Sequence, residues 1–174
     1  SDVCSSYLAI PLTNLTVTTT IQPAFVGQTI ESNTFHGGLD ELGANVEGLR
    51  QLILRLITHF QLQKAPFTIE IDTNIPQERG FGASAAFATS ITKAFFDFAN
   101  APLSPEQLKY FTDLEESISH GSASGLDAAT VNSTDPIWFV KNDLPTPFKM
   151  SLTGTLVVAD TGIHGQTRSE ERRV

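Results

Sequence analysis

A run of small residues between a strand-like segment and a helix-like segment most constrains how this chain can fold. The stretch from 75 to 96 is IPQERGFGASAAFATSITKAFF. It places Gly80 and Gly82, then four small residues, directly before a good helix-forming sequence. A simple turn needs one glycine, whereas a glycine-rich run permits unusual φ values and close approach to the backbone. We therefore expect something to come very close to the chain between 80 and 86.

A strand, a glycine loop and a helix start, in this order, suit the binding of an anion. The unpaired N–H groups of the first helical turn point at the ligand, and the helix dipole adds positive potential. Ser84 lies where its hydroxyl can bind a phosphate oxygen or a metal ion. The loop is not a Walker A loop, because no Gly-Lys-[Ser/Thr] occurs in the chain, nor does it match the Rossmann glycine spacing. The alternative is a tight strand-to-helix connection whose small residues serve close packing.

A second loop of small residues, HGSASGLDAAT from 120 to 130, adds acidic groups. Glu115 and Glu116 lie near the end of the helix predicted before it, and Asp127 lies within it. Mg²⁺ prefers hard oxygen ligands, and phosphoryl transfer needs a carboxylate near the attacking hydroxyl. Two acids separated by such flexible small residues can meet both needs. The alternatives are a solvated helix face for the two glutamates and a helix cap for the aspartate.

The order of predicted elements indicates an α+β fold. Strand-rich sequence from 7 to 31 precedes a helical pattern from 41 to about 63 and an alternating strand from 67 to 72. A second helix follows at about 84–99. The third starts with a capping box at Ser104, Pro105 and Gln107, and ends near 119. Strand-like segments follow at 137–142, 148–152 and 155–160. We expect helices on one side of a largely antiparallel sheet, with a phenylalanine stripe in the core (Phe87, Phe95, Phe96 and Phe98).

Composition excludes several classes of function. The length of 174 residues suits one domain, and no apolar run reaches the roughly 18 residues of a membrane span. The net charge of −8, with scattered basic residues, argues against nucleic-acid binding. Cys4 has no partner cysteine, which favours a reducing compartment, and we expect a cytoplasmic protein. His36, His59 and His164 show no metal-ligand spacing.

Together the two loops resemble motifs of the GHMP kinase superfamily, most closely those of bacterial mevalonate kinases. Pro76-x-x-x-Gly80-Phe81-Gly82-Ala83-Ser84-Ala85-Ala86 is similar to Pro-x-x-x-Gly-Leu-Gly-Ser-Ser-Ala-Ala. Glu116-x-x-x-His120-Gly121-x-x-Ser124-Gly125-Leu126-Asp127 is similar to Glu-x-x-x-His-Gly-Asn-Pro-Ser-Gly-[Val/Leu]-Asp. The resemblance extends from about Tyr7 to about Arg168. Either motif alone is moderately specific, and both in order are strongly so.

The resemblance implies a set of roles and a fold related to ribosomal protein S5 domain 2. The expected reaction is Mg²⁺-dependent transfer of the ATP γ-phosphate to the 5-hydroxyl of mevalonate, in isoprenoid synthesis. Asp127 is the expected catalytic residue, and Ser84 and Glu116 are the expected metal ligands. The resemblance also allows for a homodimer. ATP would bind at Gly80, Phe81, Gly82, Ala83, Ser84 and Ala85, and mevalonate at His120, Ser124 and Thr167.

The sequence departs from the family pattern in several places, and these departures determine which domains we expect in the chain. Ala83 replaces the first serine of the Ser-Ser pair, and Ser122-Ala123 replaces Asn-Pro. We expect residues 7–168 to form the N-terminal, ATP-binding domain without the family's first strand and its Lys motif, and without the C-terminal domain. The isolated chain is therefore expected to have little activity. The alternatives are another GHMP kinase, for phosphomevalonate or a sugar, and a non-catalytic nucleotide-binding remnant.

Overall fold

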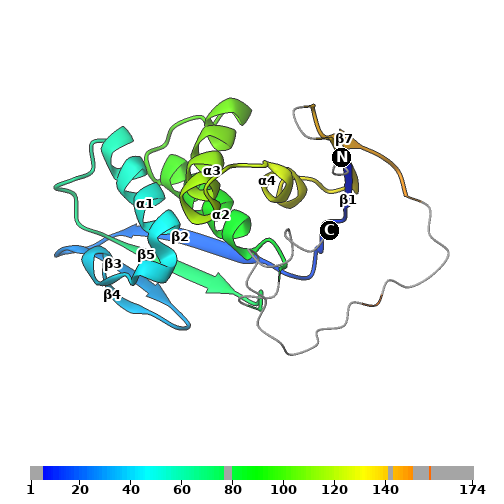
Figure 1. Ribbon diagram of the computed structural model, residues 1–174. Coiled ribbons are helices and arrows are strands. Elements are labelled where there is room, and N and C mark those ends of the chain that lie inside the picture. Colours follow the sequence, from blue (N-terminus) through cyan, green and yellow to red (C-terminus); the bar gives the residue numbers. More distant parts are fainter. Residues whose placement is uncertain (1–5, 77–79, 141–142, 151–156, 158–174) are drawn as a thin grey trace.

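The computed structural model describes residues 6–76, 80–140, 143–150 and 157. Within these ranges the chain forms two sheets and four α-helices (Figure 1). Two 3-10 turns, Leu39–Glu41 and Ala44–Val46, precede the first helix. The strands are β1 Ser6–Ala9, β2 Val17–Pro23, β3 Gln28–Ser32, β4 His36–Gly38, β5 Phe67–Thr73, β6 Ile137–Val140 and β7 Thr146–Pro147; the helices are α1 Glu47–His59, α2 Ala83–Phe98, α3 Pro105–His120 and α4 Leu126–Val131.

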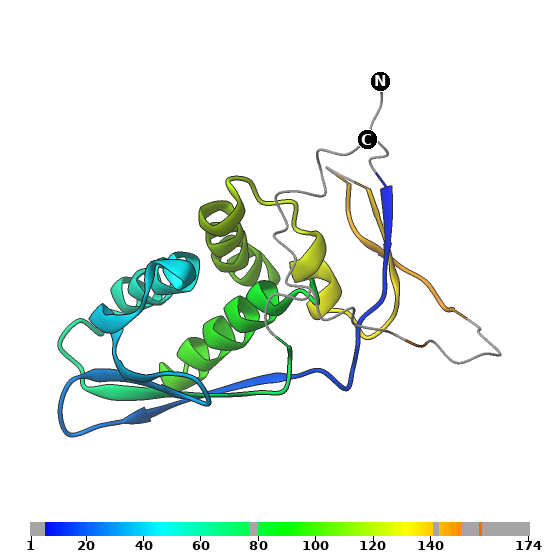
Figure 2. The ribbon, with the colours of Figure 1, turned by 60° about the horizontal axis from the view of Figure 1, so that its bottom comes forward.

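The larger sheet has the strand order β2-β5-β3-β4. β2 and β5 are antiparallel, with Ile21 opposite Ile69, and β3 and β4 are antiparallel as well. β3 and β5 are parallel, because the chain between them crosses over through α1. Helices α1, α2 and α3 lie on one face of this sheet, which confirms the predicted α+β class (Figures 1 and 2).

The core lies between this sheet and the helices. Phe67 and Ile69 of β5 are buried, whereas Glu70 and Asp72 are exposed, so the strand alternates as its sequence predicts. Phe95 is also buried and meets Phe67 edge to face at 5.8 Å between ring centroids. The predicted phenylalanine stripe is confirmed: Phe95 and Phe96 are buried in the core, and Phe87 and Phe98 pack against its margin.

A second, smaller sheet holds the beginning of the described chain. It has the order β1-β6-β7, and β1 pairs antiparallel with β6, with Leu8 opposite Trp138. Both of these side chains are about half exposed. The sequence predicted one sheet, whereas the structure has two. The predicted strand at 148–152 is wrong for residues 148–150, which have no strand pairing, while β7 lies just before them.

One helix begins later than predicted, and one short helix was not predicted at all. α1 begins at Glu47 rather than at 41, because Gly43 is extended and separates the two 3-10 turns. Residues 126–130 were expected in a loop but belong to α4, which follows Gly125 at φ 74°. The capping box of α3 is confirmed, since Ser104 accepts from the Gln107 N–H and Gln107 accepts from the Ser104 N–H. No described helix is both long and apolar enough for a membrane span.

Candidate functional site

The glycine loop leads into α2 through two residues with left-handed backbone conformation. Gly80 and Gly82 have φ values of 72° and 65°, a region that residues with a Cβ rarely adopt. Gly82 is the N-cap of α2, and its carbonyl accepts the first helical bond from the Ala86 N–H at 3.0 Å. No described side chain caps this helix start. Among the described residues no acceptor pairs with the N–H groups of Ala83, Ser84 and Ala85, where the sequence predicts that an anion binds.

The second loop is shaped by two further left-handed glycines. Gly121, at φ 84°, ends α3, and Gly125, at φ 74°, begins α4. Asp127 is the second residue of α4. A Cβ placed on Gly82 would lie 3.7 Å from Asp127 Cγ, so the two small-residue loops meet at this point. The fold thus brings together the glycine loop and the acid Asp127, which the sequence analysis considered separately.

Glu116 holds the second loop in place. Its Oε1 accepts from the Ser124 backbone N–H and from the Ser124 hydroxyl, both at 2.7 Å, and its Oε2 accepts from the Gly125 N–H at 3.1 Å. A carboxylate offers about four lone-pair sites. Three are used by these bonds, which leaves about one for another partner such as a cation.

Ser84 contacts the neighbouring glutamate instead. Its hydroxyl donates to Glu115 Oε1 at 2.6 Å, and the Ser119 hydroxyl donates to the same oxygen at 2.6 Å. Glu115 is only 2% exposed. The solvated helix face considered from the sequence is therefore wrong for Glu115. Among the described residues no three His, Cys, Asp or Glu side chains form a ready-made metal group.

The electrostatic setting of Asp127 differs from that of an ordinary surface carboxyl. Partial burial against the loops raises its pKa, and the nearby negative charge of Glu116 raises it further. His120 acts in the opposite direction and lowers it. Asp127 as a whole nevertheless remains exposed to solvent. The charges of Glu116 and His120, which lie before and at the start of the second loop in the sequence, thus both act on Asp127.

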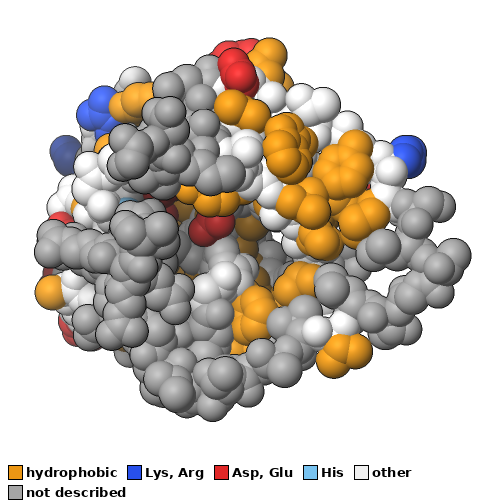
Figure 3. Space-filling model, turned by 45° about the vertical axis from the view of Figure 1, so that its right-hand side comes forward, with side chains coloured by type: hydrophobic (Ala, Val, Ile, Leu, Met, Phe, Trp, Pro, Cys, Tyr) orange, Lys and Arg blue, Asp and Glu red, His pale blue; other side chains and the backbone are white. Residues whose placement is uncertain are grey.

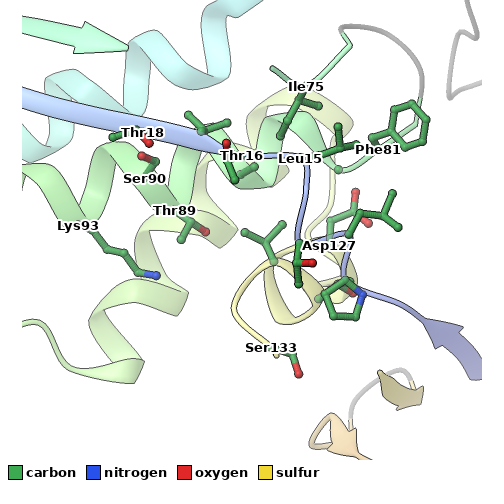
Figure 4. Close-up of a pocket in the computed structure, with 18 of the residues that line it drawn as sticks. Leu15, Thr16, Thr18, Ile75, Phe81, Thr89, Ser90, Lys93, Asp127 and Ser133 are labelled. Carbon is green, nitrogen blue, oxygen red and sulfur yellow. The ribbon is translucent and has the colours of Figure 1, made fainter. Parts of the chain in front are cut away.

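A pocket of about 670 Å³ lies between the loops, α2, α4 and the start of β2. Figure 4 shows Phe81, Thr89, Lys93 and Asp127 on its wall. In Figure 3 a hollow with an acidic side chain on its wall is visible on the side that carries α4. The pocket is large enough for a small-molecule ligand.

Lys93 is a pocket residue that sequence reasoning missed. Its Nζ donates to Asn132 Oδ1 at 3.1 Å, and Asn132 Nδ2 donates to the Thr89 hydroxyl at 3.3 Å. The sequence could have indicated this position. Polar residues on α2 recur at spacings of one, three and four and so share one face of the helix: Thr89, Ser90, Lys93 and Asp97. Thr167, a predicted substrate contact, lies outside the described residues.

Comparison with known proteins points to one family. Residues 49–133 match the model of the GHMP kinases N terminal domain, a range that includes both small-residue loops. A protein of Aeropyrum pernix named mevalonate kinase is 32% identical over 117 residues, which cover 67% of this chain and 36% of that protein.

Solved structures agree with this match. Mevalonate kinase from methicillin-resistant Staphylococcus aureus is 27% identical with a TM-score of 0.64, over 86% of this chain and 50% of that one. Methanococcus jannaschii mevalonate kinase has a TM-score of 0.65 over 78% and 47% of the two chains, and its 21% identity supports the fold alone. The chain thus spans half or less of the length of these proteins.

Proposed function

We propose a small-molecule kinase function for this chain, which belongs to the GHMP kinase family and carries that family's N-terminal domain. The proposed reaction is transfer of the ATP γ-phosphate to the 5-hydroxyl of mevalonate, with Mg²⁺. The names of the Aeropyrum and Staphylococcus relatives support this acceptor. On this proposal, residues 7–168 belong to the ATP-binding half of the enzyme.

One observation carries the proposal: a Cβ on Gly82 would lie 3.7 Å from the Asp127 carboxyl carbon, so the start of α2 and this acid lie side by side. An anion held by the first turn of α2 would therefore lie beside an acid. Phosphoryl transfer needs this combination, because the phosphate must be held while a carboxylate orients the attacking hydroxyl. If the small residues only served close packing, there would be no reason for an acid from a distant segment to lie beside the start of α2.

We assign the proposed roles as follows. The N–H groups from Ala83 to Ala85 bind the phosphates, and Asp127 orients the acceptor hydroxyl and accepts its proton. A raised pKa suits this role, because a base works best when its pKa approaches the working pH. His120 and Ser124 remain proposed acceptor contacts, together with Thr167.

The oxygen donors of the site fit Mg²⁺. Ser84 offers a hydroxyl oxygen, and Glu116 retains about one free lone-pair site after its three bonds to the loop. When bound, Mg²⁺ would neutralise phosphate charge during transfer. Lys93 adds the positive charge of an ammonium group to the pocket wall.

Turnover with separate acceptors tests the proposal. Mevalonate, phosphomevalonate and galactose would each be offered with Mg²⁺-ATP, and ADP release measured, on this chain and on the protein extended through its flanking reading frame. Release with mevalonate, lost in Asp127→Asn, supports the proposed function. Release with another acceptor only would move the protein to a different kinase of the family. Binding of nucleotide without turnover in either form would favour the non-catalytic remnant.

A further inference from the structure

Glu115 is a buried acid to which the family resemblance gives no role. It is 2% exposed, and it forms no ion pair among the residues that the structure describes. Burial of a carboxyl group is unfavourable unless hydrogen bonds compensate for the lost water. For Glu115 these hydrogen bonds come from two serine hydroxyls, which both donate to Oε1.

Three helices converge on this carboxyl group. Ser84 comes from α2, Glu115 and Ser119 come from α3, and Gly48 of α1 closes the far side. A Cβ on Gly48 would lie 2.1 Å from Ser119 Oγ and 2.7 Å from Glu115 Oε1. The absence of a side chain at Gly48 therefore leaves the room that this hydrogen-bonded cluster occupies.

The bond to Glu115 fixes the orientation of the Ser84 hydroxyl. A serine has one O–H to donate and two lone pairs to offer. Because the hydrogen of Ser84 points to Glu115, its lone pairs are directed elsewhere, and no group among the described residues donates to them. An oxygen that ligates a metal must present its lone pairs in this way, and groups behind such a ligand commonly hold it in place.

We propose that Glu115 is a positioning residue that orients the Ser84 hydroxyl as a ligand for the metal of a bound Mg²⁺-nucleotide. This rests on the proposed function. Glu115 does not itself touch the nucleotide or the metal. Its effect is therefore expected in metal-dependent binding and not in binding of the nucleotide alone.

The test measures the affinity for ADP by calorimetry, with Mg²⁺ and with a chelator in its place, on the 174-residue chain. In Glu115→Ala the Mg²⁺-dependent gain in affinity should fall about 10- to 100-fold, as for other groups behind metal ligands. Affinity for metal-free ADP should stay as in the wild type. Ser119→Ala is the matched control, because it removes the other donor to the same oxygen and leaves Ser84 intact.

Glu115→Gln guards against a folding defect in the alanine variant. Its amide oxygen can accept the same two bonds, so it should recover Mg²⁺-ADP affinity to within about threefold of the wild type. Equal Mg²⁺-dependent gains in the wild type and a folded Glu115→Ala would overturn the inference and leave the kinase proposal standing. An equal loss in Ser119→Ala would also overturn it. A wild-type chain that binds no Mg²⁺-ADP would overturn the kinase proposal, and this inference with it.

Discussion

Gly48 of α1 and Ser119 of α3 are so close that a methyl group on Gly48 would lie 2.1 Å from the Ser119 hydroxyl. Glycine to alanine within a helix ordinarily stabilises a protein by about 0.5–1 kcal/mol. Here the new methyl group would also meet Glu115 Oε1 at 2.7 Å and the Glu115 carbonyl at 3.1 Å. The clash should dominate, because backbone and a buried carboxyl group cannot both move away freely.

We therefore expect Gly48→Ala to lower the free energy of unfolding by about 1–3 kcal/mol, the usual cost of overpacking. Chemical denaturation measures this. In the double variant Gly48→Ala/Ser119→Ala part of the loss should return, since the nearest clashing atom is gone. A single variant more stable than the wild type would contradict the packing described here.

Gly82→Ala should damage binding more than its effect on stability suggests. A left-handed residue with a Cβ costs about 1–2 kcal/mol. Gly27, at φ 73° in the β2–β3 turn, is a matched control, because a Cβ there would meet nothing within 4 Å. Both alanine variants should lose similar stability by denaturation. Only Gly82→Ala should weaken nucleotide affinity, and equal affinities in the two variants would argue against this loop as the phosphate site.

Asp127→Asn should separate stability from activity. The pKa of Asp127 is raised above its ordinary 3.8, so the folded state holds this proton more tightly than the unfolded state does. Wild-type stability should therefore decrease as pH rises from about that value through the higher folded pKa. The asparagine variant should lack this decrease, and unfolding measured from acid to neutral pH would show it. Phosphoryl transfer should fall about 10²- to 10⁴-fold in the variant. A wild-type profile no different from that of the variant would contradict the raised pKa.

Ser104→Ala should destabilise α3 without touching the site. Loss of an N-cap typically costs about 1 kcal/mol, and here the reciprocal bond from the Ser104 N–H to the Gln107 side-chain oxygen should weaken too. The measurement is the denaturation midpoint. Mg²⁺-dependent ADP affinity should remain that of the wild type, because Glu115 and Glu116 lie near the other end of the helix. A changed affinity would show that the cap affects the site through the helix.

Local patterns predicted the elements that carry the candidate site, but not their relative placement. The helix after the glycine loop and the capping box of α3 depend on neighbouring residues, so the sequence indicated both. Which glutamate faces Ser84 depends on the rotation of α3 against α2. Successive helical residues point about 100° apart. The rotation of α3 about its axis therefore decides whether Glu115 or Glu116 faces Ser84. It is set by packing of residues such as Phe96 and Phe111, whose rings lie 6.0 Å apart.

The small sheet and α4 were missed for related reasons. α4 has six residues and begins after a run of small residues that favours a loop in any local pattern. The partner of β1 could not be inferred, because β6 lies far along the chain. A strand pattern predicts that pairing will occur but does not say with which strand.

The pairing of Ser6 with Val140 also bears on how the protein is made. β1 leaves the ribosome well before its partner β6, which is made more than a hundred positions later along the chain. At typical rates of synthesis the wait is on the order of ten seconds. During that time Tyr7 and Leu8 carry an apolar strand edge without its partner, while β2, β5 and the helices between them can already assemble. Closure of this small sheet is therefore expected among the last steps of folding, since it joins the most distant described segments.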